Sequence, residues 1–383
     1  MSLTRRSFLG ALGAGSAATA LPFITARGME PVSAGYRELV SSRPNPLGLP
    51  EIRLDSNENP HGPAPEALEA IQGMFSEACR YPDVSNEKLI AAIAQHLKVK
   101  DENILLGQGS SEILRVAVDT FTDPSRGLVT ASPTFELPTN RARVLGVPVV
   151  ETALAPGLLL DLDRMTDASA SAGLVFLCNP NNPTATMHGP AAVKAALDRM
   201  LAASLDSVIL VDEAYFEYVT RADHETMIPL ALANPRIVVA RTFSKVYGMA
   251  GLRVGYAVGQ PATLARMARN VLVNNINVLA AAAAWTSLSV PGHAARQQAT
   301  NTEVKGTTVR FFESRGYQVV PSEANFIMVD IQRPMQGFRQ ACRDRGVMVG
   351  RPFPPFDTHV RISIGTGEEM RQATEVFGQI LQG

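Results

Sequence analysis

Lys245 is the residue whose neighbours in the sequence most clearly suit a chemical reaction. It follows Ser244 at the end of the segment Arg241-Thr242-Phe243-Ser244-Lys245, and Arg253 comes shortly afterwards. A lysine amine can form a Schiff base with an aldehyde, while a serine hydroxyl and an arginine guanidinium can hold a phosphate by charge-assisted hydrogen bonds. The segment therefore predicts a cofactor that carries an aldehyde and a phosphate. A lone lysine after a strand would indicate only a solvated charge, so this prediction depends on the motifs that accompany it.

The segment from Val208 to Tyr215 adds a carboxylate suited to the same cofactor. Its first four residues are apolar and predict a buried parallel strand, which would present Asp212 at its carboxyl end. An aspartate there can pair with a protonated pyridine nitrogen, so that the ring stays cationic and acts as an electron sink. Tyr215 is near enough in the sequence to reach the phenolic oxygen of that ring. Alone, the segment would also fit a helix cap after a strand.

Two turn-like segments supply further polar groups. Cys178–Thr184 contains two prolines and three asparagines, which is typical of a rigid turn, and Asn182 can hydrogen-bond the phenolate oxygen of the ring. Gly107–Glu112 places small residues before a helix-like stretch, where free backbone N–H groups and the helix dipole bind phosphate. This loop lacks the third glycine of a dinucleotide fingerprint, and the chain has no GxxxxGK[ST] sequence.

Together with further motifs, these segments resemble the histidinol-phosphate aminotransferase family. The resemblance runs, in the family's order and spacing, from about residue 50 to the C-terminus. Its motifs are Asn57-Glu58-Asn59-Pro60-His61-Gly62-Pro63, Tyr81-Pro82-Asp83, the Gly107–Glu112 loop, Asn182-Pro183-Thr184, Asp212-Glu213-Ala214-Tyr215, Ser244-Lys245 and Arg361-Ile362-Ser363-Ile364-Gly365. That family belongs to the fold-type I enzymes that use pyridoxal 5'-phosphate. The resemblance implies an α/β fold in which a large domain with a mostly parallel sheet adjoins a smaller α/β domain.

The resemblance also implies roles for the residues around the cofactor. Lys245 would form the Schiff base and shuttle the proton, and Asp212 would pair with the pyridine nitrogen. Tyr215 and Asn182 would bind the phenolic oxygen. The residues implied to hold the phosphate or stack on the ring are Ser110, Ser111, Ser244, Arg253 and Phe135.

Two further roles concern a second subunit and the substrate. Tyr81 matches a tyrosine that such enzymes lend to the neighbouring subunit's phosphate, which implies a homodimer. Arg361 would clamp the substrate's carboxylate, or its phosphate where an amino-alcohol phosphate is used, with Arg351 and Asn182 also in the substrate site. The alternative for Arg361 is an exposed arginine at a strand end.

Three departures from the family's usual pattern bear on the substrate. Phe135 replaces a tyrosine, which keeps the stacking but removes a hydroxyl. Ala185 stands where glycine is common and predicts a reshaped turn. Arg351 comes one residue late and precedes a short Pro-rich loop, although an arginine there helps to hold the substrate phosphate in true histidinol-phosphate enzymes. The export signal described next and this displaced arginine favour a substrate without a phosphate.

The N-terminus predicts export. Thr4–Leu9 contains a twin arginine, and an apolar stretch rich in alanine and glycine follows to about Ile24, with small residues suited to cleavage. These features are typical of a Tat signal over residues 1 to about 28, which would place the protein in the periplasm. The stretch is too short for a stable membrane span. A disordered extension is the alternative reading, and the protein would then stay in the cytoplasm.

Composition narrows the remaining classes. A chain of 383 residues with 46% hydrophobic residues and a net charge of −1 is typical of a soluble two-domain enzyme and offers no electrostatic case for binding nucleic acid. Its three cysteines are far apart, and its six histidines lack HxxxH or HExxH spacing, so we expect neither a disulfide framework nor a metal site.

The order of apolar and helix-like segments predicts the domain boundaries. Short strand-like runs alternate with helical stretches at 104–106, 128–130, 174–178, 208–212, 237–241 and 254–258. We therefore expect a cofactor domain over residues 75–275 and a small C-terminal domain over 276–383, which a long helix starting near Leu279 would introduce. Residues 29–74 would form an N-terminal arm or lid and part of the small domain.

The predicted reaction is transamination. An amino donor, either histidinol phosphate or an L-amino acid, would exchange its amino group with a 2-oxo acid such as 2-oxoglutarate. Another pyridoxal-phosphate reaction, such as racemisation, decarboxylation or elimination, would use the same ring and lysine. A non-catalytic binding module or a structural protein would leave Lys245, Asp212 and Arg253 together unexplained.

Overall fold

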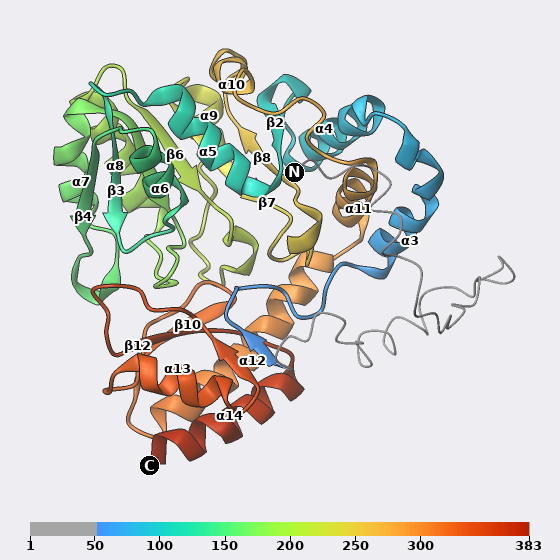
Figure 1. The fold of residues 1–383 in the computed structure, drawn as a ribbon. Helices are drawn as coiled ribbons and strands as arrows, with labels where there is room; N and C mark the ends of the chain where they lie inside the picture. Colours follow the sequence, from blue (N-terminus) through green and yellow to red (C-terminus); the bar gives the residue numbers. More distant parts are fainter. Residues whose placement is uncertain (1–51, 383) are drawn as a thin grey trace, which may run out of the picture. The chain divides into compact units, whose positions relative to one another are not determined.

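The computed structural model describes residues 52–382, which are built around a seven-stranded sheet (Figure 1). In spatial order its strands are β2 (Ile104–Gly107), β8 (Gly255–Val258), β7 (Ile237–Thr242), β6 (Val208–Asp212), β5 (Ala172–Cys178), β3 (Gly127–Ser132) and β4 (Val149–Ala153). Strands β4, β3, β5, β6 and β7 pair in parallel, whereas β8 runs antiparallel to both of its neighbours. The predicted mostly parallel α/β sheet is confirmed.

Both faces of this sheet are buried, because alternate residues of its strands point to opposite sides. In β5, Leu174 and Phe176 join one apolar cluster, and Val175 and Leu177 join the other. The first cluster includes residues of α5 (Gly109–Phe121), α6 (Leu137–Val144) and α10 (Pro261–Ala268). The second includes residues of α3 (Pro65–Gly73), α4 (Asp83–Leu97), α7 (Leu162–Ala168), α8 (Pro190–Ala203), α9 (Ile228–Ala233) and α11 (Val278–Ser289).

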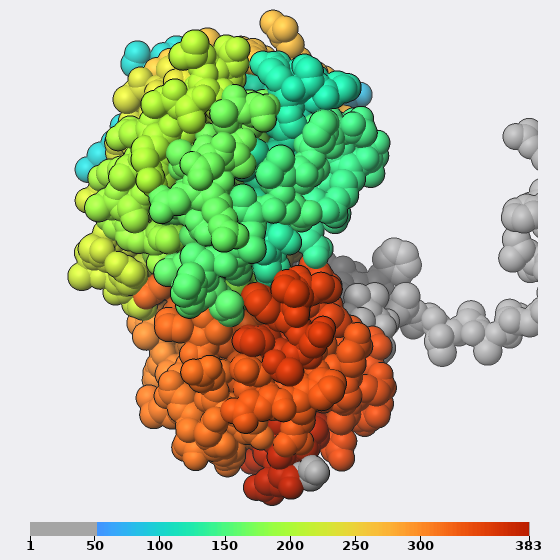
Figure 2. Space-filling model, turned by 90° about the vertical axis from the view of Figure 1, so that its left-hand side faces the viewer, coloured from blue at the N-terminus to red at the C-terminus, as the bar shows by residue number. Residues whose placement is uncertain are grey.

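A second, smaller core is built mainly from the C-terminal part of the chain. Its sheets are the antiparallel set β12-β10-β9 and the parallel pair β1-β11, with β1 (Ile52–Leu54), β9 (Gln318–Val319), β10 (Phe326–Asp330), β11 (Val347–Val349) and β12 (His359–Ser363). Its helices are α12 (His293–Glu313), α13 (Met335–Arg343) and α14 (Gly367–Gln382). Figure 2 shows residues from the middle and the C-terminal part of the sequence occupying separate regions of one face.

Three parts of the structure are poorly predicted by local sequence patterns. The helix expected to start near Leu279 is two helices, because Pro291 cannot continue α11 and Gly292 adopts a positive φ of 66° before α12. β4 lies at the sheet's edge with most of its residues exposed, so its apolar pattern is weak. β1 is only three residues long.

The N-terminal part of the described chain divides between the two cores. β1 pairs with β11, and Figure 1 shows this strand in blue among the orange and red C-terminal elements. α3 instead packs against α11. The predicted export signal lies outside the described residues. None of the helices in residues 52–382 is long and apolar enough to span a membrane.

Candidate active site

Most of the residues singled out in the sequence line one cavity of about 580 Å³. The cavity lies where the loops after β2, β3, β5, β6 and β7 meet, at the edge where open α/β sheets bind ligands. The predicted residues in its wall are Ser110, Ser111, Phe135, Asn182, Asp212, Tyr215, Ser244, Lys245, Arg253, Arg351 and Arg361. Tyr81 is not among them: its side chain is 82% exposed.

Lys245 follows β7 through a short turn, and its amine faces the segment after β1. Its Nζ donates a hydrogen bond to the Asn57 carbonyl oxygen at 3.0 Å. Burial, with the positive charge of Arg361, lowers the pKa of this amine to about 8. A buried ammonium loses its hydration, so the protonation equilibrium shifts toward the neutral amine. The neutral, nucleophilic amine is therefore much more populated near neutral pH than in an ordinary lysine.

Asp212 ends β6 and is buried in the cavity wall. Its Oδ1 accepts the backbone N–H of Ala214 at 3.1 Å. Burial raises the pKa of this carboxyl to about 7, although the Ala214 hydrogen bond and the charge of Lys245 act in the opposite direction. A cationic N–H group placed against Asp212 would stabilise the carboxylate and lower this pKa. A protonated pyridine nitrogen has that chemistry.

The N-terminus of α5 provides a cradle for a phosphate. Ser110 and Ser111 lie in its first turn, where backbone N–H groups lack partners within the helix. Arg253 approaches them: its Nη2 lies 3.4 Å from Ser111 Oγ and 3.3 Å from the Gln108 carbonyl oxygen. Gly109 permits this approach, since its φ is 69° and a β-carbon there would lie 2.5 Å from Arg253 Nη2.

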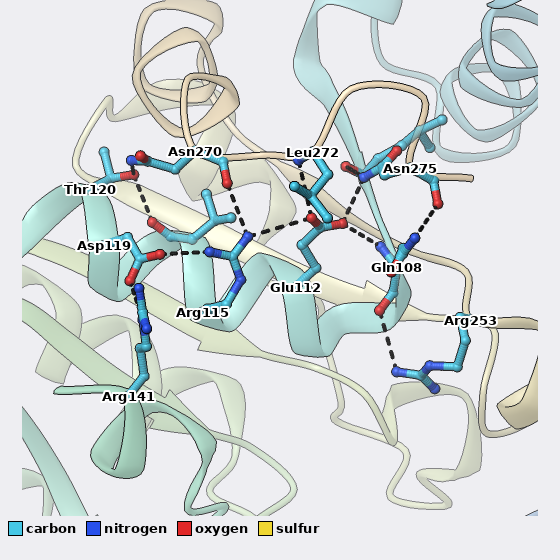
Figure 3. A network of polar contacts seen from close by, with 12 residues as sticks. Gln108, Glu112, Arg115, Asp119, Thr120, Arg141, Arg253, Asn270, Leu272 and Asn275 are labelled. Carbon is cyan, nitrogen blue, oxygen red and sulfur yellow. Dashed lines mark hydrogen bonds and ion pairs between the residues drawn. The ribbon is translucent and has the colours of Figure 1, made fainter. Parts of the chain in front are cut away.

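A polar network holds α5 in place behind this cradle (Figure 3). Glu112 accepts hydrogen bonds from the Gln108 backbone N–H at 2.8 Å and from Asn275 Nδ2 at 2.7 Å. Arg115 continues the network from Glu112 to Asp119, with which it forms an ion pair of 2.7 Å. The network therefore ties the first turns of α5 to the segment before α11, so that the N–H groups of the cradle keep their direction.

Three further arginines line the cavity and differ in their partners: Arg339, Arg351 and Arg361. Arg361 is buried, and its Nη1 and Nη2 donate to Asn182 Oδ1 at 2.8 Å and to the Asp55 carbonyl oxygen at 2.6 Å. Its Nε is buried and has no hydrogen-bond partner among the described residues. Burial lowers the pKa of this guanidinium to about 10. Arg351 is half-exposed and forms a 2.6 Å ion pair with Glu136.

Arg339 was not predicted from the sequence. It lies on α13, lines the cavity and has no ion pair or hydrogen bond within residues 52–382. Nothing in its neighbours marks it, because an arginine on an amphipathic helix normally indicates only a solvated face. Asn57 and Ser363, which contact each other, stand within motifs that carry the family resemblance, but the motifs did not indicate what these residues contact.

The residues present fit pyridoxal phosphate. The cavity offers a buried carboxyl for a cationic ring nitrogen, serine and arginine donors at a helix N-terminus for a phosphate, and a lysine amine of lowered pKa for an aldehyde. Phe135 also lies in the wall, where its ring is available for stacking.

Comparisons with known proteins agree with this chemistry. The family model of aminotransferases of class I and II matches residues 50–377. A histidinol-phosphate aminotransferase of Moorella thermoacetica is 39% identical over 342 residues, which cover 88% of this chain and 86% of the relative. One of Bacillus subtilis is 33% identical over 333 residues, covering 86% and 91%.

Solved structures show the same fold. A putative histidinol-phosphate aminotransferase of Erwinia carotovora superimposes with a TM-score of 0.83 at 30% identity, covering 87% of this chain and 96% of that one. The Sinorhizobium meliloti histidinol-phosphate aminotransferase in complex with pyridoxal-5'-phosphate has a TM-score of 0.81 at 24% identity, covering 97% and 99%. This chain therefore belongs to the class I and II aminotransferase family and is a pyridoxal-phosphate-dependent aminotransferase.

Proposed function

We propose that this aminotransferase moves an amino group between an L-amino acid and a 2-oxo acid such as 2-oxoglutarate, and that Arg361 holds the carboxylate of both. The observation that carries this proposal is the state of Arg361. Its guanidinium is buried in the cavity wall, its Nε has no hydrogen-bond partner within residues 52–382, and its hydrogen bonds go to a neutral amide and a backbone carbonyl. Asp55 and Glu136 act on this charge only at longer range, and no carboxylate of residues 52–382 forms an ion pair with it. A buried charge in this state is costly, so a substrate carboxylate would stabilise it.

The state of Arg351 favours a substrate without a phosphate. A phosphate dianion would call for a second cation beside Arg361, and Arg351 is the family's candidate. Here Glu136 already neutralises Arg351 at 2.6 Å. A phosphate would have to displace this carboxylate or accept its repulsion, whereas a neutral or apolar substrate side chain would leave the ion pair intact.

Histidinol phosphate is the second candidate for the amino donor. Its support is the 39% identity to a histidinol-phosphate aminotransferase, together with Arg339, whose guanidinium has no ion pair within the described chain and lines the same cavity. Arg339 and Arg361 together would supply two positive charges for a phosphate.

The cofactor, when bound, supplies an electron sink that makes the substrate's Cα–H bond acidic. The residues of this chain then position and move the proton. The Lys245 amine, with its pKa lowered to about 8, can accept a proton from carbon and return it. The Asp212 carboxylate stabilises the positive charge of the ring. The Arg361 guanidinium binds the substrate carboxylate and so orients the substrate.

We further propose that the active unit is a homodimer. Several large apolar side chains are exposed on two segments that flank α11: Phe75, Tyr81 and Val84 on one, and Leu272 and Val273 on the other. η2 (Phe75–Cys79) and α4 both pack on α11, which begins shortly after Val273. Exposed apolar groups of this kind are typical of a subunit interface. Tyr81 would then reach the neighbouring subunit's phosphate cradle.

We propose in addition that the protein is exported through the Tat route. The support is the twin arginine at Arg5 and Arg6 and the apolar, small-residue stretch that follows it. This route carries folded proteins, so the cofactor would be bound before export.

The first prediction separates the two substrates. Arg361→Ala should lower kcat/KM for an L-amino acid, because it removes the partner of a buried carboxylate. The expected loss corresponds to about 2–4 kcal/mol of transition-state stabilisation. Arg351→Ala serves as the matched control and should change only the preference among side chains. Steady-state kinetics with a panel of amino acids and with histidinol phosphate measures both effects. Efficient turnover of histidinol phosphate, with equal losses from both substitutions, would assign the phosphorylated substrate instead.

The second prediction concerns Lys245. In Lys245→Ala the protein should fold but no longer attach pyridoxal phosphate in a form that borohydride makes permanent. In the wild type, the rate of attachment should rise as pH increases through about 8, where the amine becomes neutral. Lys305→Met is the matched control, since burial also lowers the Lys305 pKa to about 8 but this lysine lies outside the cavity. Borohydride-stable attachment and turnover in Lys245→Ala would contradict the assignment.

The third prediction tests the shared site by mixing inactive subunits. A heterodimer of Lys245→Ala and Tyr81→Phe chains should contain one intact site, because one cavity keeps its lysine and receives Tyr81 from the other chain. A heterodimer of Lys245→Ala and Asp212→Ala chains should contain none, since both residues line one chain's cavity. Activity of purified heterodimers measures the difference. Equal, negligible recovery in both mixtures would count against a donated Tyr81.

The fourth prediction tests export. Changing Arg5 and Arg6 together to lysine should retain the protein in the cytoplasm of a bacterium with a Tat system, because the signal depends on the arginine pair rather than on charge alone. Changing Arg27 and Arg37 to lysine gives a control with the same charge and an intact pair. Fractionation followed by immunoblotting measures the outcome, and mature periplasmic protein from the Arg5 and Arg6 variant would refute the proposal.

A further inference from the structure

Asn57 connects the two cores at the cavity. Its side chain is 1% exposed, and its φ of 55° lies in the left-handed region, which asparagine tolerates better than most residues. Its side chain contacts Tyr215 and Ser363, and its carbonyl oxygen accepts hydrogen bonds from Lys245 Nζ at 3.0 Å and Asn325 Nδ2 at 3.1 Å. Lys245 and Tyr215 follow strands of the large sheet, whereas Ser363 lies on β12.

The hydrogens of this group can be assigned by counting donors and acceptors. The Asn57 backbone N–H donates to Ser363 Oγ at 2.8 Å, so the single hydroxyl hydrogen of Ser363 remains for another acceptor. That acceptor is Asn57 Oδ1, at 3.0 Å. Ser363 therefore fixes which end of the Asn57 amide is oxygen, and the NH₂ end faces Tyr215.

The orientation of the amide in turn decides what the Tyr215 hydroxyl does. Asn57 Nδ2 lies 3.1 Å from the Tyr215 oxygen, and an amide nitrogen is only a donor. The Tyr215 oxygen must accept this hydrogen bond, which leaves its own hydrogen free to be donated elsewhere. Tyr215 is buried and lines the cavity, so the free hydrogen is available to a ligand there.

We propose that Asn57, locked by Ser363, is a positioning residue that keeps the Tyr215 hydroxyl as a hydrogen-bond donor toward the cofactor. The carbonyl oxygen of the same residue accepts a hydrogen bond from the Lys245 amine. The inference rests on the placement of Tyr215 beside the phenolic oxygen of the cofactor. A donated hydrogen bond stabilises that oxygen in its charged form and so keeps the pKa of the bound cofactor low.

The isosteric change Asn57→Asp reverses this arrangement. Aspartate tolerates the left-handed backbone and can still accept from Ser363, but its second oxygen can only accept. The Tyr215 hydrogen would then turn toward the new carboxylate and away from the cofactor. Ser363→Ala weakens the arrangement without adding charge, because the Asn57 amide loses the group that fixes its orientation.

The test is the absorbance titration of the enzyme loaded with pyridoxal phosphate, supported by the separate effects on kcat and KM. Tyr215→Phe, Asn57→Asp and Ser363→Ala should each raise the cofactor's apparent pKa, with about one unit expected for the loss of one hydrogen bond to a charged oxygen. Each should lower kcat more than it changes KM. In the Tyr215→Phe background, Asn57→Asp and Ser363→Ala should raise the pKa much less, because the hydroxyl on which they act is gone.

Asn59→Asp is the matched control for added charge. Asn59 is buried on the same segment, but its Nδ2 donates to the Val246 carbonyl oxygen and to Gln297 rather than to Tyr215. Any shift that Asn59→Asp causes should persist unchanged in the Tyr215→Phe background. Thermal unfolding of every variant shows whether it is folded, and Ser363→Ala provides the test if Asn57→Asp does not fold.

Two outcomes would overturn the proposal. Equal shifts from Asn57→Asp and Ser363→Ala with and without the Tyr215 hydroxyl would mean that these residues act independently of Tyr215. An unchanged cofactor pKa in Tyr215→Phe would remove the premise that Tyr215 donates to the cofactor. Neither outcome would bear on the substrate, because the choice between an amino acid and histidinol phosphate is read from Arg361 and Arg351.

Discussion

The site depends on burying charged groups that do not fully neutralise one another. Asp212, Lys245 and Arg361 line one cavity. Burial raises the pKa of Asp212 and lowers those of Lys245 and Arg361, so it favours the neutral form of each group. The described lining of the cavity carries five basic side chains (Lys245, Arg253, Arg339, Arg351 and Arg361) and three acidic ones (Asp55, Glu58 and Asp212). Phosphate and carboxylate groups of ligands can supply the missing negative charge. The interactions missing from the protein alone are therefore the ones that bound cofactor and substrate would make.

The fold explains how such groups can be kept close together. Asp212 ends β6 and Lys245 follows β7, and these neighbouring strands are buried over their whole length. Rigid strands fix where each loop begins, so the side chains need little additional ordering when a ligand binds. Arg361 comes instead from β12 of the smaller core, and its bonds to Asn182 and Asp55 join it to the loop after β5 and to the segment after β1.

The sequence was most informative where a chemical group directly follows a strand. Lys245, Asp212 and Asn182 stand in short motifs next to apolar runs, so both their position and their chemistry could be predicted. The pairing of Asn57 with Ser363 joins residues 306 positions apart, and no local pattern predicts such a contact. Arg339 shows the same limit, because periodicity places it on a helix but does not reveal that the helix borders the cavity. The break between α11 and α12 was missed although its residues, Pro291 and Gly292, are common helix breakers.

The displaced arginine illustrates how one position can alter a substrate site without altering the reaction. Arg351 lies just beyond β11, where its guanidinium stacks 4.2 Å from the Phe353 ring centroid and pairs with Glu136. The ring of Phe353 also lies 4.8 Å from the Arg361 guanidinium. An aromatic ring beside both arginines gives this wall a flat apolar surface, whose negative face interacts with the cations. With the proposed substrate, the wall would contact an apolar or aromatic side chain while Arg361 held the carboxylate. Selection of the substrate would then depend on Phe353 and the Arg351–Glu136 pair, whereas the proposed proton transfer would depend on Lys245 and Asp212.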